Sequence, residues 1–173
     1  MDTLKNILAR VSVRDYSDKE ISDDEIRAIL DAAMSGPTAV NARPWSFIVV
    51  KDKDTLAKMA DANGKAAQLL KRAPLGILVC GDLDRAFRAA PDYWVIDGSI
   101  AAQNMILAAN AMGIGSCWLG TWPQEEKMQA QAELFGLPES IVPHSIIAFG
   151  YPKAESTKQK LIYEEDRVHF ERW

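Results

Sequence analysis

The sequence has few of the residues that hold metals or form disulfide bonds. Its 173 residues include two histidines and two cysteines. No Cys/His cluster has the spacing of a metal site, and Cys80 and Cys117 lie inside apolar, strand-like runs. We therefore interpret both thiols as small buried hydrophobic groups rather than as a disulfide or a metal pair. Reduced thiols make the cytosol the expected compartment.

Long apolar runs and a strong charge of one sign are also absent. The longest apolar stretch, residues 100–112, is interrupted by Gln103, Asn104 and Asn110, which excludes a membrane span. Residues 1–6 lack the basic and apolar regions of a signal peptide. The net charge is −4 with both signs interspersed, so no basic surface for nucleic acid is predicted. We expect a cytoplasmic protein with neither a membrane nor a nucleic-acid partner.

Side chains that could act as catalysts are scarce. Ser12, Ser99 and Ser116 have no histidine in a recognisable nucleophile arrangement, and the positions of His144 and His169 favour structural roles. A protein that has a pocket without a catalyst of its own usually takes its chemistry from a cofactor. The sequence therefore favours a cofactor-dependent site over a hydrolase triad.

Three glycines look at first like a dinucleotide-binding loop. Gly113 and Gly115 are followed by Gly120, but the second spacing is wrong, and the glycines follow a helix and precede a strand. A helix C-cap followed by a tight turn is the better interpretation. Gly120 has a separate use, because a strand end without a Cβ atom lets a planar ring approach the backbone.

Hydrophobic periodicity predicts one domain, residues 1–173, in which helices and strands alternate irregularly. The connections vary in length, which favours an α+β fold with a mixed sheet of about four strands flanked by helices. Thr3 and Ser22 are the expected caps of the first two helices. We expect helices at residues 4–11, 23–34, 54–60, 65–72, 93–112 and 124–135, and strands at residues 46–51, 75–80, 116–119 and 145–149.

The most informative segments are residues 10–16 and 37–45. The first places Arg10, Ser12 and Arg14 within five residues, and the second is a polar, proline-bounded turn that leads into a strand. Guanidinium groups bind phosphate oxygens in pairs and a hydroxyl adds a neutral donor, so the first segment suits an anionic ligand. Taken alone, these residues fit equally well a solvated helix end with surface charges.

The two segments, in this order and spacing, resemble the FMN-dependent nitroreductase family. The resemblance covers nearly the whole chain and includes Ala73-Pro74, Asp97–Ala109, Met112–Gly120, Leu137-Pro138, Ile147–Pro152, Lys158–Lys160 and Val168–Trp173. It implies a nitroreductase-like fold, a homodimer, and FMN with NADH or NADPH as co-substrate. It also implies hydride transfer through flavin N5 to a small electron acceptor, such as a nitroaromatic compound or a quinone, by a ping-pong mechanism.

Two alternatives stay open. One is a flavin-binding or redox-sensing protein without turnover, whose flavin motifs would be the same. The other sets the resemblance aside and interprets the chain as a cytosolic α+β interaction domain. Bound flavin would argue against the second alternative, and reduction of that flavin by a nicotinamide would argue against the first.

The resemblance assigns cofactor-binding roles residue by residue. Basic and hydroxyl positions for the flavin phosphate and the polar edge of the ring match Arg10, Ser12, Arg14, Lys158 and Lys160. The turn that reaches the flavin from the second subunit matches Pro37, Thr38, Ala39 and Asn41. Asp97 matches a polar position near the ribityl chain and the ring, and Leu119 and Gly120 match the strand end whose amide faces flavin N5.

Three positions depart from the family pattern. Val11 stands in the cofactor-binding segment where a basic residue or His is usual, which removes a donor. Arg43 replaces the usual Gln and puts a cation near the pocket mouth, and Gly98 stands where several small members have Cys.

A polar tail, residues 153–173, closes with Val168, Phe170 and Trp173 at alternating or near-alternating positions. We expect it to be extended and to pack on the partner subunit.

Overall fold

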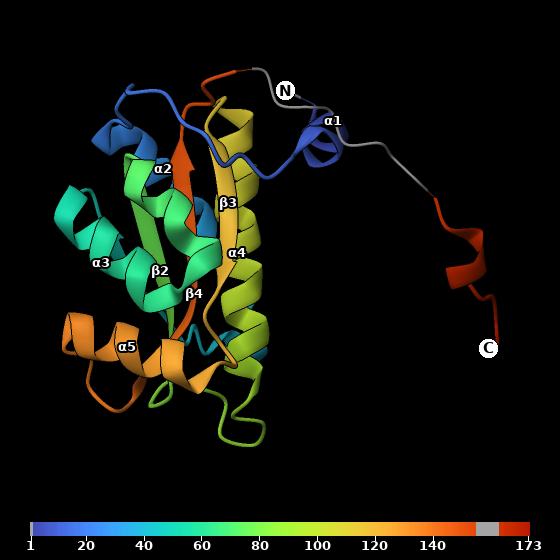
Figure 1. Cartoon of the computed structure of the whole chain (residues 1–173). Helices are drawn as coiled ribbons and strands as arrows, with labels where there is room; N and C mark the ends of the chain where they lie inside the picture. Colours follow the sequence, from blue (N-terminus) through green and yellow to red (C-terminus); the bar gives the residue numbers. More distant parts are fainter. Residues whose placement is uncertain (1, 155–162) are drawn as a thin grey trace.

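A four-stranded sheet lies between two layers of helices (Figure 1). The computed structural model describes residues 2–154 and 163–173. In chain order its elements are α1 (Thr3–Ala9), α2 (Asp23–Met34), η1 (Ala39–Asn41), β1 (Trp45–Val50), α3 (Lys53–Asn63), η2 (Lys65–Arg72), β2 (Leu75–Asp82), α4 (Tyr93–Ala111), β3 (Gly115–Gly120), α5 (Glu125–Phe135), β4 (Ile141–Gly150) and η3 (Glu165–Arg167). The α+β fold and the number of strands agree with the sequence-based prediction.

The direction of the strands corrects one expectation. The strand order is β1-β2-β4-β3, and all three neighbouring pairs are antiparallel, whereas the sequence predicted a mixed sheet. The reason is that β4, the last strand in the chain, inserts between β2 and β3 and runs opposite to both. Parallel pairing among the described residues is confined to the isolated bridge between Ser12 and Ser116.

Each face of the sheet carries its own hydrophobic core. On one face, α2 and α4 cover Ile77 and Ile147, and on the other, α3, η2 and α5 cover Leu78 and Ile146. Successive residues of a strand point to opposite faces, so a strand covered on both faces is apolar throughout. Cys80 and Cys117 are both buried and free, as the sequence indicated. Burial raises the pKa of the Cys80 thiol to about 12.

Local signals account for most helix boundaries. Ser22 and Glu25 form the expected capping box of α2. At α1 the expected cap is wrong, because Asp2 rather than Thr3 accepts the first backbone N–H groups and the helix ends at Ala9. Gly113, with φ of 77°, follows the last turn of α4 as a left-handed C-cap, which agrees with the interpretation given for this glycine.

The first helix does not bury its apolar stripe against the rest of the chain. Leu4 is 69 % exposed, and Ile7 and Leu8 are nearly half exposed. Instead the buried Asn6 attaches α1 to α4, donating from Nδ2 to the Leu107 carbonyl oxygen at 2.9 Å and accepting at Oδ1 from Asn110 at 2.7 Å. The exposed stripe is therefore available to another molecule.

The C-terminal segment lies apart from the sheet and its helices (Figure 1). In residues 163–173 the side chains are exposed, Trp173 completely. Lys158 and Lys160, predicted to contact the phosphate, lie outside the described residues. The packing of this tail on a partner subunit stays a prediction. In the part of the chain that the structure describes, no helix has the length and apolar character needed to cross a membrane.

Candidate functional site

The segment that follows α1 runs beside the outer edge of β3 and forms a cavity with α4. The backbone N–H of Val13 donates to the Ser116 carbonyl oxygen at 2.9 Å, and Ser12 bridges to Ser116. Gly115 permits this approach, because a Cβ atom there would lie 2.7 Å from the Val13 side chain. We call the resulting cavity of about 290 Å³ the open end of α4; its lining is Arg10, Ser12, Gln103, Ile106, Ser116 and Trp118.

Two further residues of the predicted phosphate-binding segment flank this cavity. Arg14 is exposed and its Nη1 donates to the Ser12 carbonyl oxygen at 3.4 Å. Its charge also reaches β3, where it opposes the rise that burial produces in the pKa of the Cys117 thiol. Val11 packs its half-buried side chain against the hydrophobic core instead of lining the cavity. The structure therefore brings Arg10 and Ser12 together, with Arg14 alongside and the Val11 side chain directed elsewhere.

The strand that borders the open end leaves its outer edge partly uncovered, because the segment after α1 bonds to this edge at Ser116. β3 is the last strand of the sheet, and Trp118, which is 37 % exposed, lines the cavity. The side chain of Leu119 points to the opposite core, so only its backbone can face a ligand. Gly120 is exposed, and a Cβ atom built on it would meet nothing within 4 Å. A flat ring could therefore approach the backbone of Gly120, as the sequence suggested.

At the other end of α4, Asp97 holds the predicted turn of the same chain. Asp97 is 3 % exposed, and its Oδ1 accepts a hydrogen bond from the Ala39 N–H at 3.1 Å. Its Oδ2 has no hydrogen-bond partner among the described residues. Burial raises the pKa of this carboxyl group, and the bond from Ala39 partly opposes the rise. We call this region, with the turn and the buried His144 described below, the closed end of α4.

The turn at the closed end is strained. Val40, Asn41 and Arg43 have φ values of 47°, 57° and 54°, a left-handed conformation that is unfavourable for a β-branched residue such as Val40. The hydroxyl of Thr38 stabilises the turn by accepting from the Arg43 N–H at 3.0 Å. Val40 is 70 % exposed, and Pro37 and Asn41 are also exposed. Strain of this kind tends to be retained where a loop has a function.

The departure at Arg43 has a structural outcome. Its guanidinium lies 5.1 Å from the centre of the Trp45 ring, which is a cation–π distance. The cation at this position therefore rests on the chain's own aromatic ring.

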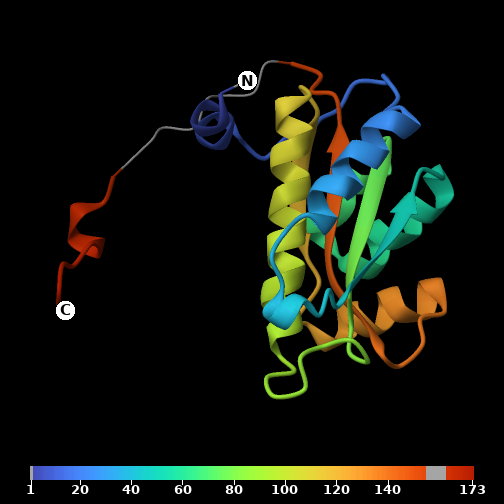
Figure 2. The ribbon, with the colours of Figure 1, turned by 180° about the vertical axis from the view of Figure 1, so that it is seen from behind.

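The open and closed ends are separated along one helix. Figure 2 shows η1 packed near the start of α4 and α1 near its end. Asp97 precedes Gln103 and Ile106 by six to nine residues, which is roughly 9–14 Å of helix. Within one chain, the predicted residues thus form two groups rather than one. A long ligand, or the turn of a second copy, would be needed to unite them.

His144 lies behind Trp118, at an irregularity of the sheet. Val79 pairs with Ser145 and Cys80 with Pro143, so His144 is the extra residue of a β-bulge. Its ring contacts Trp94 and Trp118, at centroid distances of 5.9 and 5.7 Å. Burial lowers its pKa to about 4, so the ring is neutral at pH 7. The structural role expected for this histidine agrees with these contacts.

One contact between a serine and a histidine was not visible in the sequence. Ser99, for which the sequence showed no histidine in a nucleophile arrangement, has its Oγ 3.2 Å from Nε2 of His144. The pair is not a nucleophile and base, because Ser99 Oγ donates to the Val95 carbonyl oxygen at 2.8 Å. The other ring nitrogen meets Ser145 Oγ at 2.9 Å, rather than a carboxylate. Gly98 favours the pairing, since a Cβ atom there would lie 3.3 Å from the His144 ring and would press on it.

Sequence reasoning missed three polar or aromatic residues of the open end. Gln103, Ser116 and Trp118 line the cavity with Arg10 and Ser12. The sequence did indicate a special position for Gln103. Its amide interrupts an otherwise apolar helix, and a buried amide without a hydrogen-bond partner is unfavourable, so it would be expected to face a cavity or a partner group. Ser116 and Trp118 gave none, since both fit an ordinary strand.

Comparisons with known proteins identify the family. The chain matches the nitroreductase family over residues 7–72 and 62–151. A protein of Archaeoglobus fulgidus, provisionally named NADH dehydrogenase/NAD(P)H nitroreductase, is 45 % identical over 99 % of each chain. A similarly named protein of Methanothermobacter thermautotrophicus is 42 % identical over 100 % of this chain and 88 % of its own length. The chain belongs to the nitroreductase family.

Solved structures agree with this assignment. A provisionally named NADH dehydrogenase/NAD(P)H nitroreductase from Bacteroides thetaiotaomicron superposes with a TM-score of 0.92, at 39 % identity over 100 % of this chain and 99 % of that one. An FMN-dependent nitroreductase from Clostridium difficile superposes with a TM-score of 0.89 at 29 % identity, over 98 % of this chain and 99 % of that one. The nitroreductase-like fold expected from the sequence is confirmed.

The residues of the open end fit FMN, the cofactor of this family. Arg10 supplies charge and Ser12 a hydroxyl donor, and both face one cavity together with the Trp118 ring. The open space where Gly120 has no Cβ atom adds a position where a planar ring system can approach the backbone, although the Gly120 carbonyl oxygen already accepts from Nδ2 of Asn63. Cation, hydroxyl, aromatic surface and open strand edge are together what a phosphorylated flavin requires.

Proposed function

We propose that this chain reduces a small electrophilic acceptor, such as a nitroaromatic compound or a quinone, with electrons from NADH or NADPH. In the broader sense it is an NAD(P)H-dependent oxidoreductase of the nitroreductase family that uses FMN. The observation that carries the proposal is the open end, where Arg10, Ser12 and Trp118 line one cavity against an uncovered strand edge.

The chain's own residues bind and orient the cofactor in this proposal. The chemistry that FMN would supply when bound is acceptance of a hydride from the nicotinamide and reduction of the acceptor. Arg10, Arg14 and Ser12 hold the phosphate and the polar edge of the ring by charge-assisted hydrogen bonds. The backbone at Leu119 and Gly120 offers amide groups to the ring. Among the described residues that line the cavity, none is a histidine, cysteine or carboxylate, so positioning and charge are the protein's proposed contribution.

Lys158 and Lys160 complete the phosphate contacts in our proposal. Both would keep a positive charge at positions where the family often has one Arg, but Lys lacks the planar fork of Arg. Their placement lies outside the described residues, so the assignment rests on the resemblance alone.

We further propose that the working protein is a homodimer. The exposed stripe of α1 and the exposed Ile96 of α4 give each chain uncovered apolar surface. A second copy would also bring its turn, with Pro37, Thr38, Ala39 and Asn41, to the cofactor of the first. Light scattering tests this point, because a stable monomer that carries FMN would overturn it.

A single site visited in turn by the nicotinamide and the acceptor predicts ping-pong kinetics. Initial rates measured at several fixed acceptor concentrations should give parallel lines in double-reciprocal plots. Intersecting lines would indicate that both substrates bind at once and would reject this mechanism.

The experiment that tests the proposed function follows the colour of the cofactor. Purified protein is saturated with FMN, freed of excess, and mixed without oxygen with NADH or NADPH in a stopped-flow spectrometer. We expect the flavin absorbance to bleach with at least one nicotinamide and to recover when a quinone is added. Bound FMN that neither nicotinamide bleaches would favour a flavin-binding protein without turnover. Protein that takes up no FMN would exclude both.

A further inference from the structure

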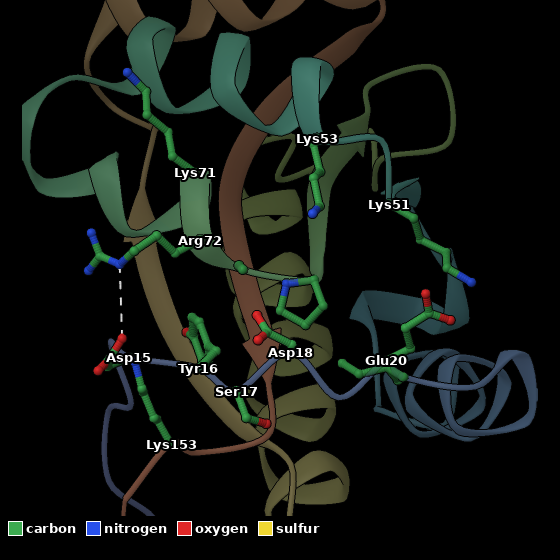
Figure 3. A pocket seen from close by; sticks show the side chains of 13 residues that line it. Asp15, Tyr16, Ser17, Asp18, Glu20, Lys51, Lys53, Lys71, Arg72 and Lys153 are labelled. Carbon is green, nitrogen blue, oxygen red and sulfur yellow. Dashed lines mark ion pairs between the residues drawn. The ribbon is translucent and has the colours of Figure 1, made fainter.

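A second cavity, larger than the open end, lies on the opposite side of the segment that contains Arg14. It has a volume of about 430 Å³ and lies between the 15–20 loop, the start of α3 and the end of η2 (Figure 3). None of the residues that line it lines the open end. The two sites nevertheless lie near each other in space. Arg72, which lines the second cavity, donates from Nη2 to the carbonyl oxygen of Arg14, which flanks the open end, at 3.5 Å.

The walls of this cavity carry opposite charges. The cations are Lys51, Lys53, Lys71, Arg72 and Lys153, and the carboxylates, Asp15, Asp18 and Glu20, all come from the 15–20 loop. The cavity thus carries more positive than negative side chains, although the net charge of the chain is −4. Lys153 and Arg72 lie beside Asp15 of this loop, whereas Lys53 comes from the start of α3. Cations and carboxylate acceptors that line one cavity suit a ligand with both an anionic group and hydrogen-bond donors.

Three of the five cations already form ion pairs with carboxylates of the protein. Lys51 pairs with Asp23 at 3.2 Å and Lys71 with Asp61 at 2.6 Å, and neither carboxylate lines the cavity. Arg72 lies 3.9 Å from Asp15.

Two lysines and two carboxylates lack such pairing. Lys53 and Lys153 form no ion pair with any described residue, and the same is true of Asp18 and Glu20. In Figure 3 the Lys53 ammonium and the Asp18 carboxylate face the space from opposite sides. They are not within ion-pair distance of each other, so a bound molecule could contact both.

The cavity also has an apolar part. Tyr16, Ile21 and Pro74 contribute to the lining, and the Tyr16 hydroxyl is already bound to the Val13 carbonyl oxygen at 2.7 Å. Tyr16 and Ile21 are only 5 % and 2 % exposed, so the half-buried Pro74 offers most of the apolar surface of these three. The size of the cavity is in the range of small-molecule sites, about 300–1,000 Å³.

We propose that this cavity binds a nucleoside monophosphate. The phosphate would lie against Lys53, with Lys153 and Arg72 contributing charge, and the ribose hydroxyls would donate to Asp18 and Glu20. The base would lie over Pro74. A ligand with only one of these three chemical parts would leave the others unmatched, which is why a nucleotide fits better than a phosphate ion or a nucleoside.

The test uses the full chain saturated with FMN, so that the probe cannot occupy the position of FMN in the open end. Binding beside FMN, where the nicotinamide is proposed to lie, is distinguished by the Lys53 variant below, because Lys53 does not line the open end. Calorimetric titration with adenosine monophosphate should give saturable binding, while the flavin absorbance shows that FMN stays bound. Adenosine and inorganic phosphate are titrated separately, and each should bind at least tenfold more weakly than the nucleotide. Binding should also weaken with added salt, because the phosphate contacts are exposed.

The decisive variant is Lys53→Glu, with Lys58→Glu as its matched control. Both lysines are exposed residues of α3, but only Lys53 lines the cavity. Lys53→Glu should weaken nucleotide binding about tenfold or more, and Lys58→Glu should change it less than twofold. An acidic residue in the first turn of a helix is favourable, so Lys53→Glu is expected to stay folded.

Each result decides for or against the site. No saturable nucleotide binding, or equal losses in the two variants, overturns the proposal. Inorganic phosphate binding as tightly as the nucleotide would reject nucleoside recognition, and adenosine binding as tightly would reject the role of the lysines. Release of FMN during the titration would place the nucleotide at the open end and also count against the proposal. None of these outcomes depends on whether the chain reduces an acceptor.

Discussion

The two ends of α4 are built in opposite ways. At the open end, Arg10, Ser12 and Gln103 surround a cavity beside an uncovered strand edge, and Trp118 forms part of its wall. At the closed end, Asp97 and His144 are almost fully buried and bound to neighbouring groups. The open end is thus equipped to bind a ligand, and the closed end to hold parts of the protein in place. Substitutions at the closed end should therefore change stability, and those at the open end should change affinity.

The largest effect is expected for His144→Ala at the closed end. The substitution removes a buried ring that Trp94, Trp118 and Ser99 contact, so it should lower the free energy of unfolding by roughly 2–4 kcal/mol. Urea unfolding at pH 7 measures this change. The matched control is His169→Ala in the exposed tail, which should stay within about 0.5 kcal/mol of wild type. Equal effects of the two would show that the closed end is not a stabilising region.

The same histidine predicts a pH dependence. Burial lowers its pKa to about 4 in the folded protein, below the ordinary value of 6.5. Between these values the unfolded chain binds more protons than the folded chain, so wild-type stability should fall as pH falls from about 6.5 towards 4. His144→Gln lacks this titration, so its stability difference from wild type should shrink over that range. A difference independent of pH would mean that His144 is not buried in its neutral form.

A smaller effect is expected at Asp97. Asp97→Ala leaves the Ala39 N–H without its acceptor and should cost about 1–2 kcal/mol in unfolding free energy. Asp97→Asn keeps an acceptor oxygen and removes a buried charge. Because burial raises the pKa of Asp97, its stabilising contribution is present in acid and is lost as pH rises through the folded pKa. Asp97→Asn should therefore be at least as stable as wild type at pH 7; a loss as large as that of the Ala variant would contradict this account.

The smallest effect is expected in the strained turn. Val40→Gly relieves a left-handed β-branched residue whose side chain is largely exposed, and should raise the free energy of unfolding by about 0.5–1 kcal/mol. Ala42→Gly is the matched control, because Ala42 has φ of −68° and should lose a similar amount instead. If thermal unfolding shows that Val40→Gly raises the free energy of unfolding and Ala42→Gly lowers it, the strain at Val40 is established. If both variants are destabilised alike, the left-handed conformation of Val40 carries no measurable cost.

The two ends also differ in how much of them could be predicted from the sequence. Arg10, Ser12 and Arg14 were visible because charged and hydroxyl groups close together in the chain stay close in the fold. The capping box of α2 and the glycine after α4 were visible for the same reason. In each case the residues that interact are only a few positions apart in the chain, so the local backbone conformation is enough to bring them together.

The closed end depends on contacts that local patterns do not contain. Asp97 meets Ala39 across 58 residues, and Ser99 meets His144 across 45. The second contact occurs at a bulge in β4 and is favoured by the glycine at position 98, and neither feature has a sequence signature of its own. The strand directions were predicted wrongly for a related reason. No local signal shows that β4 inserts between β2 and β3, so the antiparallel pairing could not be predicted from the sequence.

The central claim is that the open end holds FMN by its phosphate, and Arg10→Ala tests it most directly. Losing one charge-assisted contact should weaken FMN binding by about 1.5–3 kcal/mol, roughly tenfold to a hundredfold. Riboflavin, which lacks the phosphate, should bind with nearly unchanged affinity. Lys5→Ala, an exposed position on the preceding helix, is the matched control and should affect neither flavin. Fluorescence titration of both flavins gives the answer: a selective loss of FMN affinity supports the account, and equal losses, or no loss for either flavin, would contradict it.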